Sequence, residues 1–391
     1  MANKLLEGVR IVDITTFVTG PLTTRTLSDC GAEVIKLDTR SRVAGGGGRA
    51  GVNQHDTSKL SITLNFRDPK GLELAYRLIA KSDVVVENHA AGTLIRRGLG
   101  YKDLKKIKPD IIMLSSCMQG QTGPYASHAA FGHQLTALSG FNHITGWPDR
   151  EPGWLGPYTD VIAPRYNIIT ILAALDYRRR TGKGQFLDMA QQEAGIQFLS
   201  PILLDYAVNK RVANRMGNQY PYAAPNNAYR CTGDDMWCAI SVFTEDEWQS
   251  FCKVIGLPSL ANNPKYSTLK ARKENEEELD RLVNEWTMKR SAQEVMYLMQ
   301  EAGVAAGVAE TAEGEMGDDP QLKHRHFFWE LEHPEVGKYS TPTGQHFLFS
   351  KTNYELKRAP LVGENNDYVF KGILGLSDEE VAQLIKEKVI D

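Results

Sequence analysis

Asp160 is the residue of this chain whose type and position could support covalent chemistry. It stands in the sequence YTDVIAP, just before a predicted helix with an apolar run at 168–175 and three arginines at 178–180. Pro164 fits the first turn of that helix, where its missing N–H costs little. An aspartate at a helix start usually caps the helix. A carboxylate there could also act as a nucleophile or transfer a proton, and the residue types alone leave both interpretations open.

Strand-like and helix-like segments alternate through the first half of the chain, and these segments must position Asp160. Strands are predicted at residues 8–14, 32–37, 60–64, 83–87, 111–115 and 186–189, and helices at 22–30 and 68–81. Such alternation predicts an α/β fold with a mostly parallel sheet covered by helices. Ligands of these sheets bind outside the carboxyl ends of the strands. The loops at 17–20, 38–49, 88–97 and 117–124 are therefore expected on one functional rim.

A glycine-rich loop follows the second predicted strand. It combines four consecutive glycines with Arg40, Arg42 and Arg49. Backbone amides and guanidinium groups of this kind could bind phosphates. The loop is neither a Walker loop nor a G-x-G-x-x-G turn, because no Gly-Lys-Ser/Thr and no helix follow it. A flexible surface loop is the alternative interpretation.

The composition of the chain changes after residue 205. Residues 1–205 form the predicted large domain, and the turn-rich residues 206–224 form a linker. Residues 225–325 contain helix-capping signals and a strand, which predicts a small α+β domain. Residues 326–391 begin with strand-like segments and end in a helix that is expected to return to the large domain.

The bulk properties exclude several classes of protein. The 391 residues are too many for one ordinary core, and 42% apolar with 24% charged residues is typical of a globular protein. The net charge of −3 favours neither a nucleic acid nor a membrane surface as a partner, and no apolar run is long enough to span a membrane. Five scattered cysteines without a C-x-x-C pair predict reduced thiols, no metal site and a cytoplasmic location.

Six segments, in the same order, resemble the class III CoA-transferases of the formyl-CoA transferase or CaiB/BaiF type. They begin with LLEGVRIVDIT and GPLTTRTLSDCGAEVIKLD, continue through SDVVVENHAAGTLIRRGLGYKDL and GQTGPY, and end with APLVGENNDYVF. The segment YTD…ILAALDYRRRTGKGQFLDMAQQEA resembles the block that carries the catalytic aspartate of the family, which falls on Asp160. Within the family, AFGHQLTALSGFNHITGWPDREPG is most similar to succinyl-CoA:benzylsuccinate CoA-transferase subunits.

The resemblance implies an enzyme that moves CoA from an acyl-CoA donor, such as succinyl-CoA, to a carboxylic acid. Asp160 would form an aspartyl anhydride and then an aspartyl-CoA thioester. The implied architecture is a Rossmann-like large domain with a smaller domain, in an interlocked dimer. The partner would be a second copy of the chain or a related subunit.

The resemblance also implies a set of CoA-contacting residues. Phe17, Val18 and Thr19 fall on the loop that contacts CoA, and His89 stands where phenylalanine is usual. Thr39 stands where relatives have a basic residue, for which a neighbouring arginine would substitute. The implied CoA-binding residues are Phe17, Val18, Thr19, Arg40, Arg42, Arg49, Asn88, His89, Arg96 and Arg97.

Two other functions stay open. An α-methylacyl-CoA racemase shares the fold and uses a His–Asp pair, for which His133 and Asp160 are the candidates. In two-subunit members of the family, one chain can bind CoA or organise its partner without catalysing transfer. The presence of Asp160 favours a catalytic chain.

Overall fold

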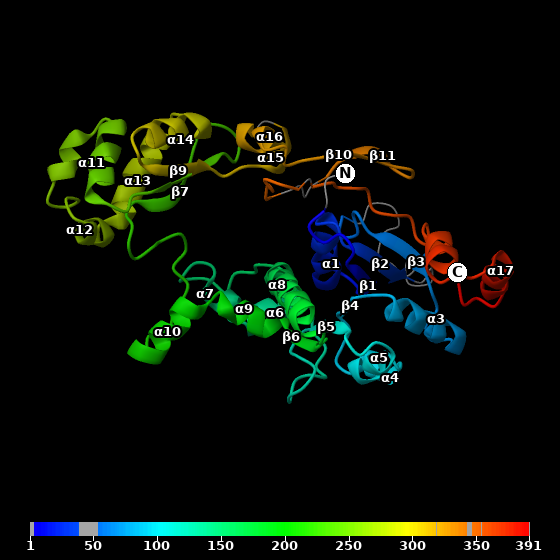
Figure 1. Ribbon diagram of the computed structural model, residues 1–391. Helices are drawn as coiled ribbons and strands as arrows, with labels where there is room; N and C mark the ends of the chain where they lie inside the picture. The colour runs from blue at the N-terminus through cyan, green and yellow to red at the C-terminus, as the bar shows by residue number, and fades with distance from the viewer. Residues whose placement is uncertain (1–3, 39–53, 318, 342–345, 353, 391) are drawn as a thin grey trace. The chain divides into compact units, whose positions relative to one another are not determined.

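The computed structural model describes residues 4–38, 54–317, 319–341, 346–352 and 354–390 (Figure 1). The chain forms two compact units. The first comprises Met1–Asn142, Trp154–Ala213 and Leu322–Asp391, and the second comprises His143–Gly153 and Asn214–Gln321. The domain limits expected from the sequence stay a prediction.

The first unit contains a six-stranded sheet in which every pair of neighbours is parallel, in the order β3-β2-β1-β4-β5-β6. The strands are β1 (Arg10–Ile14), β2 (Glu33–Asp38), β3 (Leu60–Thr63), β4 (Val84–Glu87), β5 (Ile112–Cys117) and β6 (Phe186–Ala190). The predicted α/β class with a Rossmann-like parallel sheet is confirmed. The strand order reverses between β1 and β4, and in such sheets the crevice at this point binds ligands.

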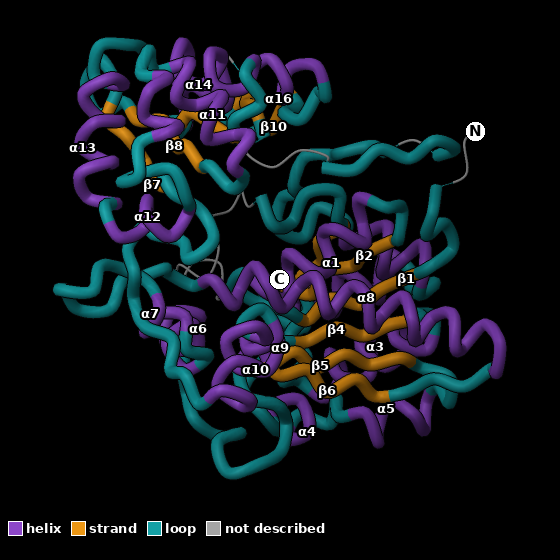
Figure 2. The backbone as a smooth tube through the Cα atoms, turned by 90° about the vertical axis from the view of Figure 1, so that its left-hand side faces the viewer, coloured by secondary structure: helices purple, strands orange, loops and turns teal. Residues whose placement is uncertain are grey.

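Helices cover both faces of this sheet, as Figure 2 shows for the neighbouring strands β1, β4, β5 and β6. On one face, Ile11, Val84 and Leu114 belong to a core that includes Leu27 and Ile171 from two of the helices. On the other face, residues of β1, β2 and β4 pack with a helix and the C-terminal segment. Strands buried on both faces read as nearly continuous apolar runs, which explains why the sequence predicted them.

The helices of the first unit connect the strands and cover the sheet. They are α1 (Thr19–Asp29), α3 (Pro69–Ala80), α4 (Thr93–Arg96), α5 (Tyr101–Ile107), α6 (Gly132–Leu138), α7 (Phe141–Ile144), α8 (Tyr158–Thr181), α9 (Gln191–Gln197) and α10 (Ser200–Asn209). Near the C-terminus follow the π-helix η3 (Tyr368–Ile373) and α17 (Asp378–Lys386). Helix α7 reaches across the boundary into the second unit.

The C-terminal segment protects the edge of the sheet. Asn365 Oδ1 accepts a hydrogen bond from the Ser61 amide, and Asn366 Oδ1 accepts one from the Thr63 amide, both at 2.9 Å. These side chains occupy donors of the edge strand β3 that would otherwise be open to another strand. A hairpin of β10 (Glu330–His333) and β11 (Gly337–Ser340) precedes this segment.

The second unit is built on an antiparallel sheet of β7 (Asn226–Arg230), β8 (Trp237–Ser241) and β9 (Ala305–Val308). Thr244 caps the first helix, because its hydroxyl accepts a hydrogen bond from the Glu247 amide, and the two residues form a capping box. The helical elements are α11 (Glu245–Val254), η2 (Pro258–Asn262), α12 (Leu269–Glu274), α13 (Glu276–Thr287), α14 (Ala292–Glu301) and α15 (Ala312–Gly317), and α16 (Pro320–His324) crosses the boundary between the units.

Residues His143–Gly153 belong to the second unit, although they lie within residues 1–205, the predicted large domain. The guanidinium of Arg215 donates to the carbonyl of His143 at 3.0 Å and to the carbonyl of Arg150 at 3.1 Å. Two backbone carbonyls of this segment are thereby tied to a residue 65 or more positions away.

Candidate active site

Asp160 is the third residue of α8 and is half-buried. The N-cap position belongs to Pro157, and no side chain caps the helix. The Asp160 carboxylate instead accepts a hydrogen bond at Oδ1 from the hydroxyl of Thr19, at 3.3 Å. The interpretation of Asp160 as a helix cap is therefore wrong, and its carboxylate interacts with a residue 141 positions away.

Pro164 lies inside α8, not in its first turn as expected. The helix begins at Tyr158, so Pro164 is its seventh residue. A proline has no N–H for the carbonyl four residues earlier, which here is the carbonyl of Asp160. The helical hydrogen-bond pattern is thus interrupted at the residue expected to do the chemistry.

Gly132, the first residue of α6, gives the Asp160 carboxylate its space. A Cβ atom added at Gly132 would lie 2.5 Å from Oδ2 and 2.6 Å from both Cγ and Oδ1 of Asp160. Real Cβ atoms essentially never approach other atoms so closely. Glycine is therefore required at this position because of the close approach of a side chain.

We expect Gly132→Ala to lower kcat by about 100-fold, because displacing a reacting group by about 1 Å can cost that much. Gly307→Ala is the matched control, since the same methyl group would meet no atom within 4 Å there. Both variants should retain the circular-dichroism spectrum of the parent protein. Unchanged transfer activity in Gly132→Ala would contradict the tight contact.

His133 follows Gly132 and also acts on Asp160. Its ring stacks on the indole of Trp154, with ring centroids 5.3 Å apart and an angle of 19° between the planes. Its Nδ1 is buried and has no hydrogen-bond partner among the described residues. The imidazole lowers the pKa of Asp160 electrostatically. The sequence-predicted pair of His133 and Asp160 is thus brought into one neighbourhood.

The surroundings of Asp160 act on the pKa of its carboxyl in opposite directions. Burial is the largest effect and raises the pKa of the carboxyl above its ordinary value, although the Thr19 hydroxyl and His133 lower it. Loss of water therefore outweighs the groups that favour the anion. A carboxylate of raised pKa with little hydration is a better nucleophile than one in water.

Gln191 belongs to the site and was missed from the sequence. It is the first residue of α9, directly after β6, and its side-chain amide Nε2 donates to Thr19 Oγ1 at 2.6 Å. Its place at the carboxyl end of a predicted strand was a signal that could have identified it. Asp160, Thr19, Gly132 and Gln191 all lie near the starts of helices.

Asn88 fixes the loop between β1 and α1 at the crevice where the strand order reverses. Its Oδ1 accepts from the Thr16 amide and its Nδ2 donates to the Thr16 carbonyl, both at 2.7 Å. This pair of bonds joins the carboxyl ends of β4 and β1. Gly20 permits the approach, because a Cβ there would lie 2.4 Å from Thr15 and 2.9 Å from Asn88.

Phe17 and Val18 lie on this loop, just before Thr19 begins α1. Phe17 has a φ of 63°, in the left-handed region that residues with side chains rarely adopt. Phe17 is 62% exposed and forms a T-shaped pair with Phe131, itself 64% exposed, with ring centroids 5.9 Å apart. Backbone strain and exposed aromatic rings beside a half-buried acid are typical of a ligand-binding site.

His89 is held by the acid that precedes Asn88. Its amide donates to Glu87 Oε2 at 2.8 Å, and its Nδ1 lies 3.5 Å from the same oxygen. Gln121 links this segment to the next loop, because its Oε1 accepts from the Gly92 amide at 3.0 Å. The loops after β4 and β5 are therefore connected, as expected for one rim.

Arg96 and Arg97, both predicted to bind CoA, form a basic cluster with Arg67. Arg67 was not among the predicted residues. Burial is the main cause that lowers the pKa of Arg97, and the two neighbouring guanidinium groups lower it further. The Arg97 guanidinium lies 5.7 Å from the centre of the Phe66 ring. Cations held this close together attract a polyanion such as a phosphate group. Arg40, Arg42 and Arg49, the other predicted basic residues, lie outside the described residues.

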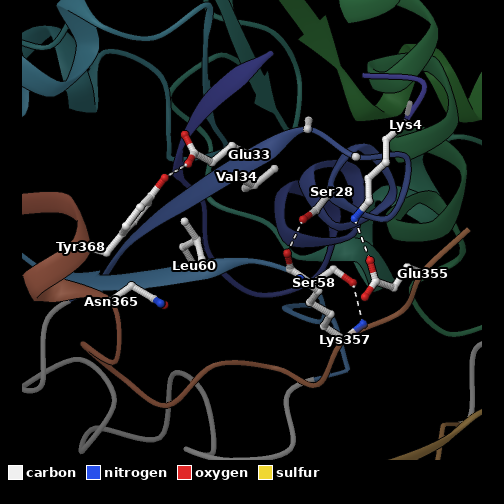
Figure 3. Close-up of a pocket in the computed structure, with 12 residues that line it drawn as sticks. Lys4, Ser28, Glu33, Val34, Ser58, Leu60, Glu355, Lys357, Asn365 and Tyr368 are labelled. Atoms are coloured by element: carbon white, nitrogen blue, oxygen red, sulfur yellow. Dashed lines mark hydrogen bonds and ion pairs between the residues drawn. The ribbon is translucent and has the colours of Figure 1, made fainter. Parts of the chain in front are cut away.

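A separate cavity of about 440 Å³ lies at the amino ends of the strands, away from the carboxyl ends where the site is (Figure 3). It is lined by Glu33 and Leu60, the first residues of β2 and β3, so it opens at the amino ends of the strands. Two of its acidic groups are paired, Glu355 with Lys4 and Glu33 with Arg10. Asp160 does not line this cavity.

Within the described part of the chain, no group of three or more His, Cys, Asp or Glu side chains is arranged to hold a metal ion. No helix among these residues combines the length and the apolar character needed to cross a membrane.

The chain is similar to known proteins over most of its length. A family model described as CoA-transferase family III matches residues 6–366. The chain belongs to CoA-transferase family III. A succinyl-CoA:glutarate CoA-transferase of Homo sapiens is 33% identical over 404 residues, which cover 99% of this chain and 90% of that protein. A succinyl-CoA–D-citramalate CoA-transferase of Chloroflexus aurantiacus is 32% identical, covering 98% of each.

The fold of this CoA-transferase family member is also found among solved structures. A CaiB/BaiF family protein from Brucella suis matches with a TM-score of 0.86 and 30% identity, covering 95% of this chain and all of that one. The predicted family and enzyme class are confirmed. The narrower resemblance to benzylsuccinate CoA-transferase subunits stays a prediction.

Proposed function

We propose that this chain moves CoA from an acyl-CoA donor to a carboxylic acid acceptor by covalent catalysis at Asp160. The observation that carries the proposal is the half-buried carboxylate of Asp160, placed against Gly132 and the Thr19 hydroxyl. Relatives are named for succinyl-CoA with glutarate or D-citramalate. Succinyl-CoA is therefore the proposed donor, and a dicarboxylic acid is the proposed class of acceptor.

The reaction requires no redox chemistry and no net proton transfer. An oxygen of Asp160 attacks the thioester carbonyl, a C–O bond forms, and CoA leaves as a thiolate. The thiolate then attacks Cγ of Asp160, which gives an aspartyl-CoA thioester and releases the donor acid. The acceptor carboxylate repeats these steps in reverse, and each step exchanges bonds of similar energy.

CoA is proposed to lie along the rim formed by the loops after β1, β3 and β4. Its phosphate groups would meet Arg96, Arg97 and Arg67, because guanidinium groups bind phosphates in a bidentate manner. The exposed rings of Phe17 and Phe131 offer an apolar surface beside Asp160 for the pantetheine arm or the acyl group. Water must be excluded there, because it would hydrolyse the anhydride.

The direct experiment incubates the purified chain with succinyl-CoA and a panel of mono- and dicarboxylic acids, and follows new acyl-CoA esters by mass spectrometry. We expect transfer to dicarboxylic acids. The neighbourhood of His133 and Asp160 favours one other reaction, racemisation at the carbon next to the thioester. Uptake of deuterium at that carbon without any acceptor acid would favour a racemase and contradict the transferase proposal.

A further part of the proposal is that the chain works as a dimer. Helix α10 has no buried residue, although its sequence SPILLDYAVN is mostly apolar, and Leu204 is 65% exposed. Exposed apolar surface of this kind marks a protein–protein interface. Relatives in Chloroflexus aurantiacus named as alpha and beta subunits leave either a second copy or a related chain as partner.

We expect Leu204→Glu to convert the dimer to a smaller species in light scattering after size-exclusion chromatography, because a charge would be buried at the interface. Lys210→Glu, a change at an exposed position just after α10, is the control. A parent protein that elutes as a monomer and transfers CoA alone would contradict the dimer.

A further inference from the structure

The buried side-chain amide of Gln191 is linked through Thr19 to Asp160, the proposed nucleophile. The side chain of Gln191 is only 6% exposed, and its Nε2 donates to Thr19 Oγ1 at 2.6 Å. Burying an amide is unfavourable unless its hydrogen bonds are satisfied. The buried amide of Gln191 therefore donates its hydrogen bond to the hydroxyl of Thr19, a residue that is only 3% exposed.

The direction of these hydrogen bonds follows from chemistry. An ionised carboxylate only accepts, so the Thr19 hydroxyl must donate its proton to Asp160 Oδ1, 3.3 Å away. Its lone pair is then free to accept from Gln191. A hydroxyl that accepts one strong hydrogen bond becomes a better donor for the next. The three residues form a chain of donors that ends on the carboxylate.

We propose that Gln191 is a positioning residue of the transfer reaction, which holds the Thr19 hydroxyl on Oδ1 of Asp160 and leaves Oδ2 as the attacking oxygen. The inference rests on the proposed function. Gln191 itself would touch no substrate, and it would act only through Thr19. Thr19, in contrast, would contact a reacting atom and thus be a catalytic residue.

The assignment explains how charge is stabilised at the aspartyl carbon. When Oδ2 attacks the thioester and CoA thiolate leaves, Oδ1 becomes the carbonyl oxygen of the anhydride. The thiolate then adds to Cγ, and the electron pair of the C=O bond moves onto Oδ1. The Thr19 hydroxyl donates to this oxyanion, as donors in oxyanion holes do. The intermediate collapses as the Cγ–Oδ2 bond breaks, and Oδ2 leaves with the donor acid.

Few other groups compete for Asp160. Helix α6 brings His133, which lowers the pKa of the carboxyl, and α1 brings Thr19. Other titratable groups lie on elements packed against α8. Arg25 pairs with Asp29, and Asp188 accepts from the Gln121 amide. Burial raises the pKa of Cys117 to about 11, and Glu193 is exposed. Loss of the Thr19 hydrogen bond should therefore raise the pKa of Asp160.

The experiment measures kcat, KM for the acyl-CoA and the pH dependence of kcat/KM in four variants: Thr19→Ser, Thr19→Val, Gln191→Leu and the double variant Thr19→Val with Gln191→Leu. We expect Thr19→Val to lower kcat by about 100-fold, as loss of one oxyanion donor does. Gln191→Leu should lower kcat by about 10-fold, and Thr19→Ser should keep most of it. KM should change little, and the acidic limb of kcat/KM should move to higher pH in Thr19→Val and Gln191→Leu.

The double variant distinguishes positioning from a general effect on folding. If Gln191 acts only through Thr19, the double variant is no slower than Thr19→Val, because interacting residues are not additive. Losses that multiply, or a Gln191→Leu enzyme with normal kcat and pH dependence, would overturn the inference. If these outcomes are found while the parent enzyme transfers CoA and Asp160→Ala does not, only the inference about Gln191 fails and the proposed function stands. A parent enzyme that transfers no CoA overturns both.

Discussion

Asp160→Ala is expected to lower the rate of CoA transfer by about a thousandfold or more, because the variant has no oxygen to form the anhydride. The fold should persist, since Asp160 does not cap α8 and its side chain makes one hydrogen bond among the described residues, the 3.3 Å contact with Thr19. Initial rates with succinyl-CoA and an active acceptor measure the effect. Hydroxylamine added with the donor should mark Asp160 in a mass spectrum of the parent protein.

Asp176→Ala is the matched control on the same helix. Asp176 lies in the exposed last turns of α8, where it pairs with Arg179 and Arg180. Its loss should leave transfer within about twofold of the parent rate, because exposed ion pairs contribute little. An Asp160→Ala enzyme with near-normal turnover, or a hydroxylamine mark on another carboxylate, would remove Asp160 as the nucleophile.

Lys59→Met is expected to destabilise the first unit by about 3–5 kcal/mol, the usual result of removing one partner from a buried ion pair. Lys59 Nζ donates to Asp13 Oδ2 at 2.9 Å and to Asp56 Oδ1 at 2.7 Å, and the side chains of Lys59 and Asp13 are fully buried. Burial alone would lower the pKa of Lys59, but the two carboxylates raise it above its ordinary value. Methionine would leave the carboxylate of Asp13 charged without this partner.

The position of this network links stability to the site. Asp13 lies on β1, just before the loop that carries Phe17, and it accepts from the hydroxyl of Thr24 in α1 at 2.6 Å. Lys59 also donates to the carbonyl of Pro21, at 3.0 Å. The network therefore holds the start of α1, where Thr19 contacts Asp160.

Urea unfolding followed by circular dichroism measures the Lys59 effect. Lys70→Met is the control, because Lys70 pairs with Glu387 on the surface and its replacement should change the free energy of unfolding little. The double variant Asp13→Asn with Lys59→Met should recover part of the loss, since one unpaired charge is removed. A loss for Lys59→Met as small as that of the control would contradict a stabilising role for the network.

Helices and strands could be predicted from the sequence where their positions depend on patterns among neighbouring residues. The apolar runs of β4 and β5 predicted buried strands, and helix-capping signals predicted helices within residues 225–325, where Thr244 and Ser291 cap α11 and α14. The helix predicted at 22–30 begins earlier, at Thr19, within the loop expected at 17–20. Gly20 is needed there because Thr15 and Asn88 approach it closely, which no local pattern reveals.

Residues 158–181 illustrate the same division for the site. The aspartate, the helix and the resemblance of the surrounding segment were all visible in the amino-acid order, so the family and the candidate nucleophile could be named. The first residue of the helix could not be predicted, because Pro157 and Pro164 both suit the beginning of a helix. In the folded chain the helix begins next to Pro157, and Pro164 lies inside it.

By itself, the sequence determined the α/β class and the alternation of elements, since these depend on residue types and their spacing, and its resemblance to a known family identified Asp160 as the candidate acid. Only the tertiary structure decided what surrounds that acid. Thr19 lies 141 residues from Asp160, and Gln191 lies 172 residues from Thr19. They meet because parallel strands end at one edge of the sheet and the helices that follow begin there, and which side chains then touch depends on packing across the whole unit.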